Sequence, residues 1–227
     1  MKVMLDLERK IHNCMKCKHT NLRRILPYSP VYSFGDPTGK EILVVGLNPS
    51  SREYINGYLS NSPNIEERRK SQLTYFKRRN YKYFNEIERF FGDEVKKKIH
   101  WTNSPWEKVG YLDLVKCPTK SARGQWSKIP TRQKETLIRN CEEYLKEQIN
   151  LYKPKMILPY GADVGKWFAG YLRVTYEPFE DEKAQLNNRK VKLLFIPQRQ
   201  GPHSKPEILW VQNKILEMRA QMEVDEL

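Results

Sequence analysis

Four runs of consecutive apolar residues occur along the chain, and each ends in residues that favour turns. They are EILVVGL (41–47), YLDLV (111–115), KMILPYG (155–161) and VKLLFIP (191–197). Apolar runs of this length, without alternation, are typical of strands that are buried on both faces of a parallel sheet. The pattern therefore predicts four parallel strands.

Helical segments separate these strands and follow the last of them. They span residues 83–99, 131–152, 162–172 and 205–223. Because strands that alternate with helices imply right-handed crossovers, we predict an α/β fold, a three-layer α/β/α sandwich around a central four-stranded parallel sheet. The chain has 227 residues, of which 39% are apolar, and no internal repeat, so we expect residues 1–227 to form a single domain.

The stretch VVGLNPSSREY (44–54) begins as the first predicted strand and ends in a turn. Ligands of such sheets bind at the carboxyl ends of the strands. Here these ends are the turns after Leu47, Val115, Tyr160 and Pro197. The first turn opens a long polar segment, residues 48–72, which we expect to be a binding loop.

Basic residues outnumber acidic ones, with 41 Lys and Arg against 27 Asp and Glu and a formal net charge of +14. A positive field over much of the surface favours a polyanionic partner. Thermophilic proteins also carry many charged residues, but they tend to balance the two signs. We therefore expect the protein to bind nucleic acid.

Apolar runs in the chain all fall short of the ~20 residues that span a membrane. The N-terminus, MKVMLDLERKIHNC, lacks the apolar core of a signal peptide. We expect a soluble, intracellular protein of the cytoplasm, associated with the nucleoid.

The chain has four cysteines, the number that one metal centre uses. They are Cys14 and Cys17, which form a C-x-x-C motif, Cys117 and Cys141. Both Zn²⁺ and a [4Fe–4S] cluster accept four cysteines, so the ligand type does not choose between them. A neighbouring histidine, His12 or His19, is an alternative ligand, two unrelated buried thiols are another alternative, and disulfides are unusual inside cells. Any such metal would tie the N-terminal segment, residues 1–40, to the rest of the fold.

In their order along the chain, these motifs resemble those of the uracil-DNA glycosylase superfamily. The motifs are C-x-x-C at 14–17, Gly-Asp-Pro at 35–37, ILVVGLNPS at 42–50, DLVKCP at 113–118, Cys141, KPKMILPYGADV at 153–164 and GPHS at 201–204. The resemblance is closest to the iron–sulfur branches, family 4 and family 5, with an Asn-type first motif. It implies a [4Fe–4S] cluster on Cys14, Cys17, Cys117 and Cys141, with zinc as the alternative.

The resemblance implies catalytic roles for Asn48 and His203. Asn48 lies where the family holds the attacking water at the sugar C1′, and an Asn orients water without acting as a strong base. Orienting the water is sufficient if the glycosidic bond breaks before the water attacks, because the resulting sugar cation is stabilised mainly by electrostatic interactions. Alternatively, Asn48 closes an Asx turn at Pro49.

His203 lies where the family places a histidine that bonds uracil O2 as the base leaves. The family order is His-Pro-Ser, whereas here Pro202 precedes the histidine, which alters the geometry of the loop. The alternative is that His203 is only a neighbour of Ser204, which would cap the last helix.

Base recognition is assigned by the same resemblance to Asp113, Tyr58, Gly46 and Leu47. Where this chain has Asp113, the iron–sulfur glycosylases commonly have an Asn that donates to uracil O4, and an ionised Asp can only accept. Either burial keeps Asp113 protonated, or the target is another base, such as a deaminated purine. Asp113 pointing into the structure, towards Lys116, is the remaining alternative. Tyr58, with Tyr54 as second candidate, would stack on the extruded base.

DNA contacts are expected from basic segments and from two loops. The segments are ERRK (67–70), FKRR (76–79) and VKKK (95–98), and the loop residues are Arg123, Lys128, Arg199, Gln200 and Lys205. Arg199 or Gln200 is also the expected wedge that fills the vacated base stack.

Taken together, these features predict a monomeric, monofunctional DNA glycosylase that flips out uracil, hypoxanthine or xanthine and hydrolyses the N-glycosidic bond. A non-catalytic protein that binds damaged or single-stranded DNA on the same scaffold is the first alternative. An unrelated zinc-containing α/β enzyme acting on nucleotides or RNA is the second.

Overall fold

The computed structural model describes residues 2–17, 28–78, 82–98, 104–119, 126–198 and 202–224. The strands are β1 (Ile42–Gly46), β2 (Val109–Asp113), β3 (Met156–Pro159), β4 (Asp181–Leu186) and β5 (Arg189–Leu194). The α-helices are α1 (Lys2–His12), α2 (Ser51–Ile55), α3 (Ile65–Leu73), α4 (Tyr75–Arg78), α5 (Lys82–Glu88), α6 (Asp93–Lys98), α7 (Thr131–Tyr152), α8 (Ala162–Leu172) and α9 (Lys205–Val224). Short 3-10 turns lie at Arg89–Phe91, Pro105–Glu107 and Trp126–Lys128.

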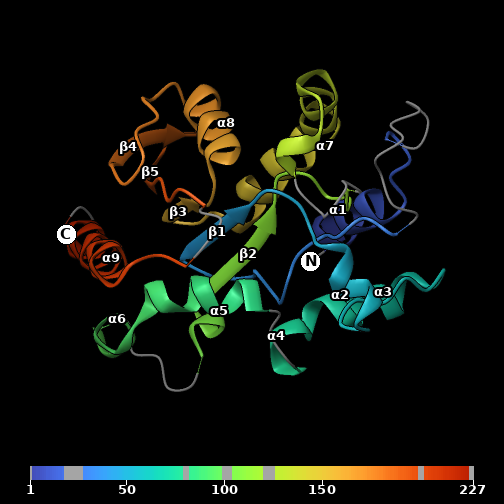
Figure 1. The fold of residues 1–227 in the computed structure, drawn as a ribbon, viewed down its shortest axis with the longest axis horizontal. Helices are drawn as coiled ribbons and strands as arrows, with labels where there is room; N and C mark the ends of the chain where they lie inside the picture. The colour runs from blue at the N-terminus through green and yellow to red at the C-terminus, as the bar shows by residue number, and fades with distance from the viewer. Residues whose placement is uncertain are drawn as a thin grey trace. The chain divides into compact units, whose positions relative to one another are not determined.

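The strands form one sheet in the order β2-β1-β3-β5-β4 (Figure 1). β1 and β3 are parallel, with Ile42 opposite Met156, and β3 is parallel to β5. This mostly parallel sheet with flanking helices confirms the predicted α/β fold class and is consistent with a three-layer sandwich.

The prediction of four strands, all parallel, was wrong in one respect: β4 is a fifth strand, antiparallel to β5. Its sequence, DEKAQL, is polar, and only Ala184 and Leu186 are buried, so it has no continuous apolar run. The turn between β4 and β5 is Asn187–Asn188, and both residues have positive φ, 48° and 62°. Two such residues make the turn that matches the twist of a hairpin.

Three of the four predicted helices are present, and the fourth needs correction. The segments 131–152, 162–172 and 205–223 correspond to α7, α8 and α9. The segment 83–99 is not one helix, because α5 ends in a 3-10 turn and Gly92 separates that turn from α6.

The expected binding loop, residues 48–72, contains two helices, α2 and α3. Each begins at a side-chain cap: Ser50 accepts from the N–H of Arg52, and Asn64 accepts from the N–H of Glu66 at 2.8 Å. Ser and Asn are among the strongest helix-capping residues, so short helices form here in a polar sequence.

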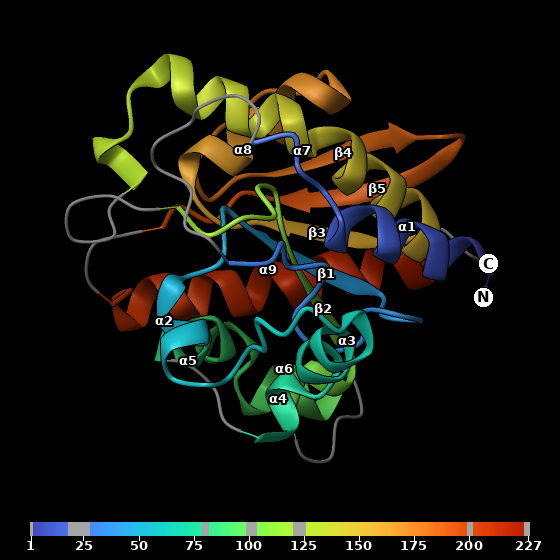
Figure 2. The same ribbon diagram turned by 90° about the vertical axis from the view of Figure 1, so that its right-hand side faces the viewer.

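The chain divides into two compact units. Unit 1 contains residues 1–37, 47–79 and 111–152, and unit 2 contains residues 38–46, 80–110 and 153–227. In unit 1, α1 lies along α7 (Figure 2), and Phe34 packs edge-to-face on Tyr75 and Tyr111. In unit 2, α8 packs on β3 and β4, and α9 packs on β5 and α6.

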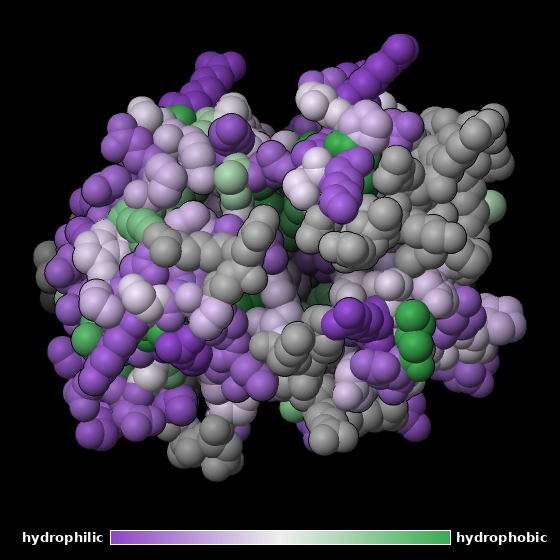
Figure 3. All heavy atoms as spheres, viewed as in Figure 1, coloured by the Kyte–Doolittle hydropathy of each residue, from purple (hydrophilic) through white to green (hydrophobic). Residues whose placement is uncertain are grey.

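Hydrophilic side chains cover most of the face shown in Figure 3, as the excess of charged residues leads us to expect. None of the helices in the described part of the chain is long and apolar enough to cross a membrane.

Gly35, in the Gly-Asp-Pro segment, adopts a backbone conformation that other residues rarely adopt, with φ +71°. A Cβ at this position would lie 2.7 Å from Cδ2 of Phe76, which is too close. We therefore expect Gly35→Ala to lower the free energy of unfolding by about 1–3 kcal/mol, measured by urea denaturation.

Gly39→Ala is the matched control for this variant. Gly39 has a similar φ of +68°, but no atom lies within 4 Å of the added Cβ. The difference between the two variants therefore isolates the clash with Phe76. Equal losses would contradict it.

Candidate functional site

Asn48 lies in the turn that follows β1, and its side chain is fixed from two sides. Its amide Nδ2 donates to the carbonyl of Pro49 at 3.1 Å and to Oγ1 of Thr119 at 3.2 Å. Because a carbonyl oxygen can only accept, the side-chain atom of Asn48 that contacts Pro49 must be the amide nitrogen, Nδ2. Among the described residues, no hydrogen bond reaches Oδ1 of Asn48. The half-buried side chain is thus able to accept one hydrogen bond from a ligand or water. The contact with Pro49 also fits the Asx-turn alternative.

Three buried ionisable side chains lie close to this turn in unit 1. Glu53, on α2, is 2% exposed, Asp113, at the end of β2, is 3% exposed, and Lys116 is 1% exposed. The Lys116 ammonium donates to the main-chain carbonyl of Asp113, and the hydroxyl of Tyr111 donates to Oδ1 of Asp113 at 3.2 Å. Oε2 of Glu53 and Oδ2 of Asp113 are buried and have no hydrogen-bond partner among the described residues.

The pKa values of both carboxyl groups are raised. Burial, and then the charge of Asp113, raises the pKa of Glu53 to about 8. Burial also raises the pKa of Asp113 to about 7, although Lys116 and the hydrogen bond from Tyr111 act in the opposite direction. Desolvation disfavours the charged form of an acid, which is the cause in both cases. Glu53 was not among the predicted site residues; the signal for it in the sequence is an acidic residue in the first turn of the helix that follows the first strand.

The two aromatic candidates differ in their surroundings. Tyr54 is buried, its ring stacks on Tyr28 with centroids 4.6 Å apart, and its hydroxyl donates to the carbonyl of Ser29. These contacts occupy Tyr54 within the structure, so it does not fit the role of a stacking platform. Tyr58 is half-buried, and its ring meets Tyr75 edge-to-face at 6.2 Å. Tyr58 therefore remains the candidate.

Gly46 ends β1 and is buried. Leu47 follows it, is partly exposed, and its carbonyl accepts a hydrogen bond from the N–H of Val115 at 2.8 Å. Among the described residues, no contact of Gly46 or Leu47 identifies a ligand.

The four cysteines come together in unit 1. Cys17, Cys117 and Cys141 are buried and Cys14 is partly exposed, and all four are free thiols. Hydrogen bonds from Cys117 and Cys141, opposed by burial, lower the pKa of Cys17 to about 3. Cys14 interacts electrostatically with Cys117. An apolar cluster surrounds the thiols, formed by Val115, Ile129, Leu137, Trp126 and Ile138.

Two further hydrogen bonds reach the sulfur atoms. The main-chain N–H of Lys116 donates to Sγ of Cys141, and the side-chain amide of Asn140 donates to Sγ of Cys17, both at 3.4 Å. Within the described part of the chain, no three His, Cys, Asp or Glu side chains surround a common point in a way that holds a metal ion. The thiols instead contact one another. Donor type, number, burial and the hydrogen bonds to sulfur nevertheless fit a four-cysteine centre.

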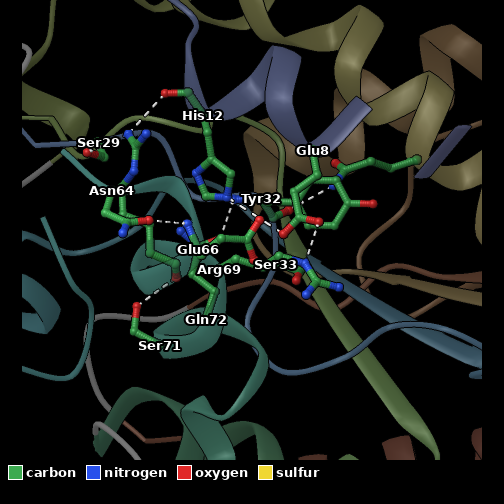
Figure 4. A network of polar contacts seen from close by, with 12 residues as sticks. Glu8, His12, Ser29, Tyr32, Ser33, Asn64, Glu66, Arg69, Ser71 and Gln72 are labelled. Carbon is green, nitrogen blue, oxygen red and sulfur yellow. Dashed lines mark hydrogen bonds and ion pairs between the residues drawn. The ribbon is translucent and has the colours of Figure 1, made fainter. Parts of the chain in front are cut away.

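His12 and His19 were the alternative metal ligands, and the structure describes only His12. His12 is buried, and its Nε2 lies 3.7 Å from Oε1 of Glu8 (Figure 4), too far for a hydrogen bond. Its carbonyl accepts from Arg68. His12 therefore packs in the interior of unit 1. His19 lies outside the described residues.

Two arginines of the basic stretch 67–70 bind within the protein, contrary to the predicted DNA contact. Arg68 is buried, and its Nη1 donates to the carbonyl of His12 at 3.1 Å and to Oγ of Ser29 at 3.0 Å. Arg69 pairs with the buried Glu8, with Nε 2.9 Å from Oε2 (Figure 4). Residues 67–70 occupy both the inward and the outward face of α3. The charge of a residue does not tell which of these faces it occupies.

The other predicted DNA contacts are surface residues or lie outside the described residues. Lys128 and Lys205 are exposed. Lys96 and Lys97 are paired with Asp93 and Glu94 on the same helix. Arg79, Arg123, Arg199 and Gln200 are outside the described residues.

His203, in unit 2, is held by two acceptors. Its Nδ1 lies 3.0 Å from Oε1 of Glu86, its Nε2 lies 2.9 Å from the carbonyl of Pro197, and its main-chain N–H also donates to Glu86. Its side chain is fully buried against Phe90, with ring centroids 5.0 Å apart. In this arrangement both ring nitrogens are used within unit 2.

A mostly parallel α/β sheet with a polar turn at the carboxyl end of its first strand defines a class of ligand-binding proteins. Residues 32–209, well over half of the chain, match the family described as the uracil DNA glycosylase superfamily. The chain therefore belongs to this superfamily, whose members are DNA glycosylases that act on DNA. A search of curated proteins found no match.

Arg69 provides a test of the structural role of the basic stretch. Removing it deprives the carboxylate of Glu8, which is 5% exposed, of the charge and hydrogen bond of Arg69. We expect Arg69→Ala to lower the free energy of unfolding by about 1–3 kcal/mol, measured by chemical denaturation. The exposed neighbour Lys70 is the control, and Lys70→Ala should change stability by no more than about 0.5 kcal/mol. If the two variants are equally stable, the interior role of Arg69 is wrong.

Proposed function

We propose that this chain is a monofunctional DNA glycosylase that removes a deaminated base, uracil, hypoxanthine or xanthine, from DNA. The arrangement of Asn48 carries the proposal. Its amide nitrogen is held by Pro49 and Thr119, and no described residue bonds to its oxygen. Buried carboxyl groups of Glu53 and Asp113 belong to the same unit. Membership of the superfamily supports the reaction type.

The reaction follows from what these side chains are able to do. The bond between C1′ and the base nitrogen breaks, and its electron pair leaves with the base. A water oxygen then bonds to C1′, and the proton that the water loses ends on the released base. Asn48 accepts a hydrogen bond from that water and orients it, because a neutral amide does not remove a proton. Fixing the amide in advance lowers the entropic cost of this step.

A second candidate function, binding of damaged DNA without base release, is favoured by one observation. His203, which the family resemblance assigns to uracil O2, uses both ring nitrogens on Glu86 and Pro197. For Nε2 of His203 to contact a base, its hydrogen bond to the Pro197 carbonyl would have to break. The catalytic role of His203 thus stays a prediction.

Base release from a panel of oligonucleotides distinguishes the two functions. Single strands and duplexes carry uracil, hypoxanthine or xanthine, and abasic sites are scored. We expect at least one base to be released, and Asn48→Ala to slow its release by about a hundredfold, within the range for loss of one positioned polar group.

Asn56→Ala is the control, since Asn56 is exposed at the end of α2. Its release rate should match that of the unchanged protein. Metal-loaded protein that binds the DNA but releases no base would support the binding function instead.

We also propose that the four cysteines hold a [4Fe–4S] cluster, with zinc as the alternative. The cluster would join the segment containing Cys14 and Cys17 to Cys117, after β2, and Cys141, on α7. When bound, it would supply cross-linking of these elements, and none of the steps above passes through it.

Metal analysis of the purified protein tests this assignment. We expect about four irons and visible absorbance, both lost in Cys141→Ser. Asn140→Ala removes a hydrogen bond to sulfur but no ligand, so it should keep the iron. One zinc in a colourless protein would contradict the iron–sulfur assignment and support zinc.

A further inference from the structure

We propose that Glu86 keeps both ring nitrogens of His203 protonated, so that His203 is a buried cation. We infer further that Glu86 acts in this way as a positioning residue for base release. The first part concerns the folded protein alone, and the second part rests on the proposed glycosylase function. Glu86 lies on α5 and was not among the predicted site residues.

Both ring nitrogens of His203 face atoms that accept hydrogen bonds. Nδ1 lies 3.0 Å from Oε1 of Glu86, and Nε2 lies 2.9 Å from the main-chain carbonyl oxygen of Pro197. A neutral imidazole carries one N–H and one lone pair. If its only hydrogen were on Nδ1, the lone pair of Nε2 would point at the carbonyl oxygen, which is a repulsive contact. Nε2 therefore carries a hydrogen, and the second proton lies either on Nδ1 or on Glu86.

Glu86 accepts hydrogen bonds from two further donors, which favours the second proton on His203. The main-chain N–H of His203 donates to Oε1, and Nη1 of Arg89 donates to Oε2 at 2.7 Å. Donors on both oxygens stabilise a carboxylate relative to a carboxylic acid. Burial acts against ionisation, but these hydrogen bonds and the charge of Arg89 outweigh it, so the pKa of Glu86 is lowered from its usual value of 4.5. Glu86 is thus ionised at neutral pH, and Nδ1 of His203 keeps its hydrogen.

The surroundings of the imidazole shield this ion pair from water. The side chain of His203 is fully buried, and that of Glu86 is 18% exposed. The imidazole lies beside the rings of Phe90 and Tyr160, with centroids 5.0 Å and 6.1 Å away. Burial, and then the charge of Glu86, raises the pKa of Tyr160, so its hydroxyl is neutral. The carboxylate of Glu207 accepts hydrogen bonds from the residue that follows His203. Opposite charges that are removed from water in this way attract each other strongly.

The hydrogen bonds also fix His203 between three segments of unit 2. Glu86, on α5, binds both its main chain and its ring. Pro197, which follows β5, binds Nε2, and α9 begins at Lys205, two residues after His203. Hydrogen bonds between charged groups are stronger than those between neutral groups. Glu86 therefore determines both the orientation and the charge of the imidazole.

Under the proposed function, the charge of His203 would act on the departing base. The base leaves with the electron pair of the broken bond and therefore carries negative charge. A cationic N–H donor stabilises such a charge more strongly than a neutral donor. The Pro197 carbonyl and a carbonyl oxygen of a base are both acceptors, so the hydrogen bond of Nε2 can pass from one to the other without gain or loss of a proton. While bound to Pro197, His203 thus already has the protonation state that base release would use.

NMR of metal-loaded protein with nitrogen-15 in its histidines measures the protonation of His203. At neutral pH we expect hydrogens on both ring nitrogens of His203, with the signals assigned through its main chain. Glu86→Gln keeps the shape and the hydrogen-bonding capacity of the side chain but removes its charge, so His203 should lose one ring hydrogen. Glu94→Gln, at an exposed position of α6, is the control and should leave both hydrogens in place. A neutral His203 in the unchanged protein would overturn the ion pair, and so would a doubly protonated one in Glu86→Gln. If Glu86→Gln does not fold, the unchanged protein still decides the matter.

Base release by the same variants tests the positioning role. With an oligonucleotide that the unchanged protein processes, we expect Glu86→Gln to release the base about tenfold more slowly at saturating DNA, because the charge on His203 is lost. Its affinity for the DNA should stay within about twofold, and Glu94→Gln should match the unchanged protein in both measurements. An unchanged release rate in Glu86→Gln would overturn the positioning role. If the unchanged protein releases no base while His203 carries both hydrogens, the glycosylase function and the positioning role are rejected, and the ion pair stands.

Discussion

Lys116 connects three parts of unit 1, and the candidate site depends on it. Its main-chain N–H donates to the sulfur of Cys141, its carbonyl accepts from the N–H of Val31, and its ammonium donates to the carbonyl of Asp113. The residue is almost completely buried, so each of these groups needs a partner inside the protein. One residue thus links the position of the cysteines to the end of β2 that carries the buried Asp113.

The sequence predicted those features that depend on a continuous pattern. The four apolar runs identified four strands, and the segments between and after these runs identified α7, α8 and α9. β4 was not predicted because buried and exposed residues alternate at its end, so it has no continuous apolar run. Its pairing with β5 also depends on the positive φ values of Asn187 and Asn188 in the turn. Such backbone conformations follow from the hairpin as much as from the residues themselves.

For the site, the sequence indicated positions but not the partners of each side chain. Asn48 and Asp113 were identified by the resemblance to the superfamily. Glu53 is recognised only in the structure, where it is buried and the charge of Asp113 adds to the rise of its pKa. Arg68 and Arg69 look like surface charges in the sequence, yet both turn inward from α3. Burial of a charge depends on tertiary contacts, which no local pattern contains.

Arg68 also affects how the N-terminal cysteines are assembled. By binding the carbonyl of His12 and the hydroxyl of Ser29 with one nitrogen, it holds together the two ends of the segment that contains Cys14 and Cys17. Bringing the ends of a chain segment together costs conformational entropy. Because the protein itself closes this loop, binding of the proposed cluster would have less chain to order. Arg68 would therefore help to preorganise these two thiols for the proposed cluster.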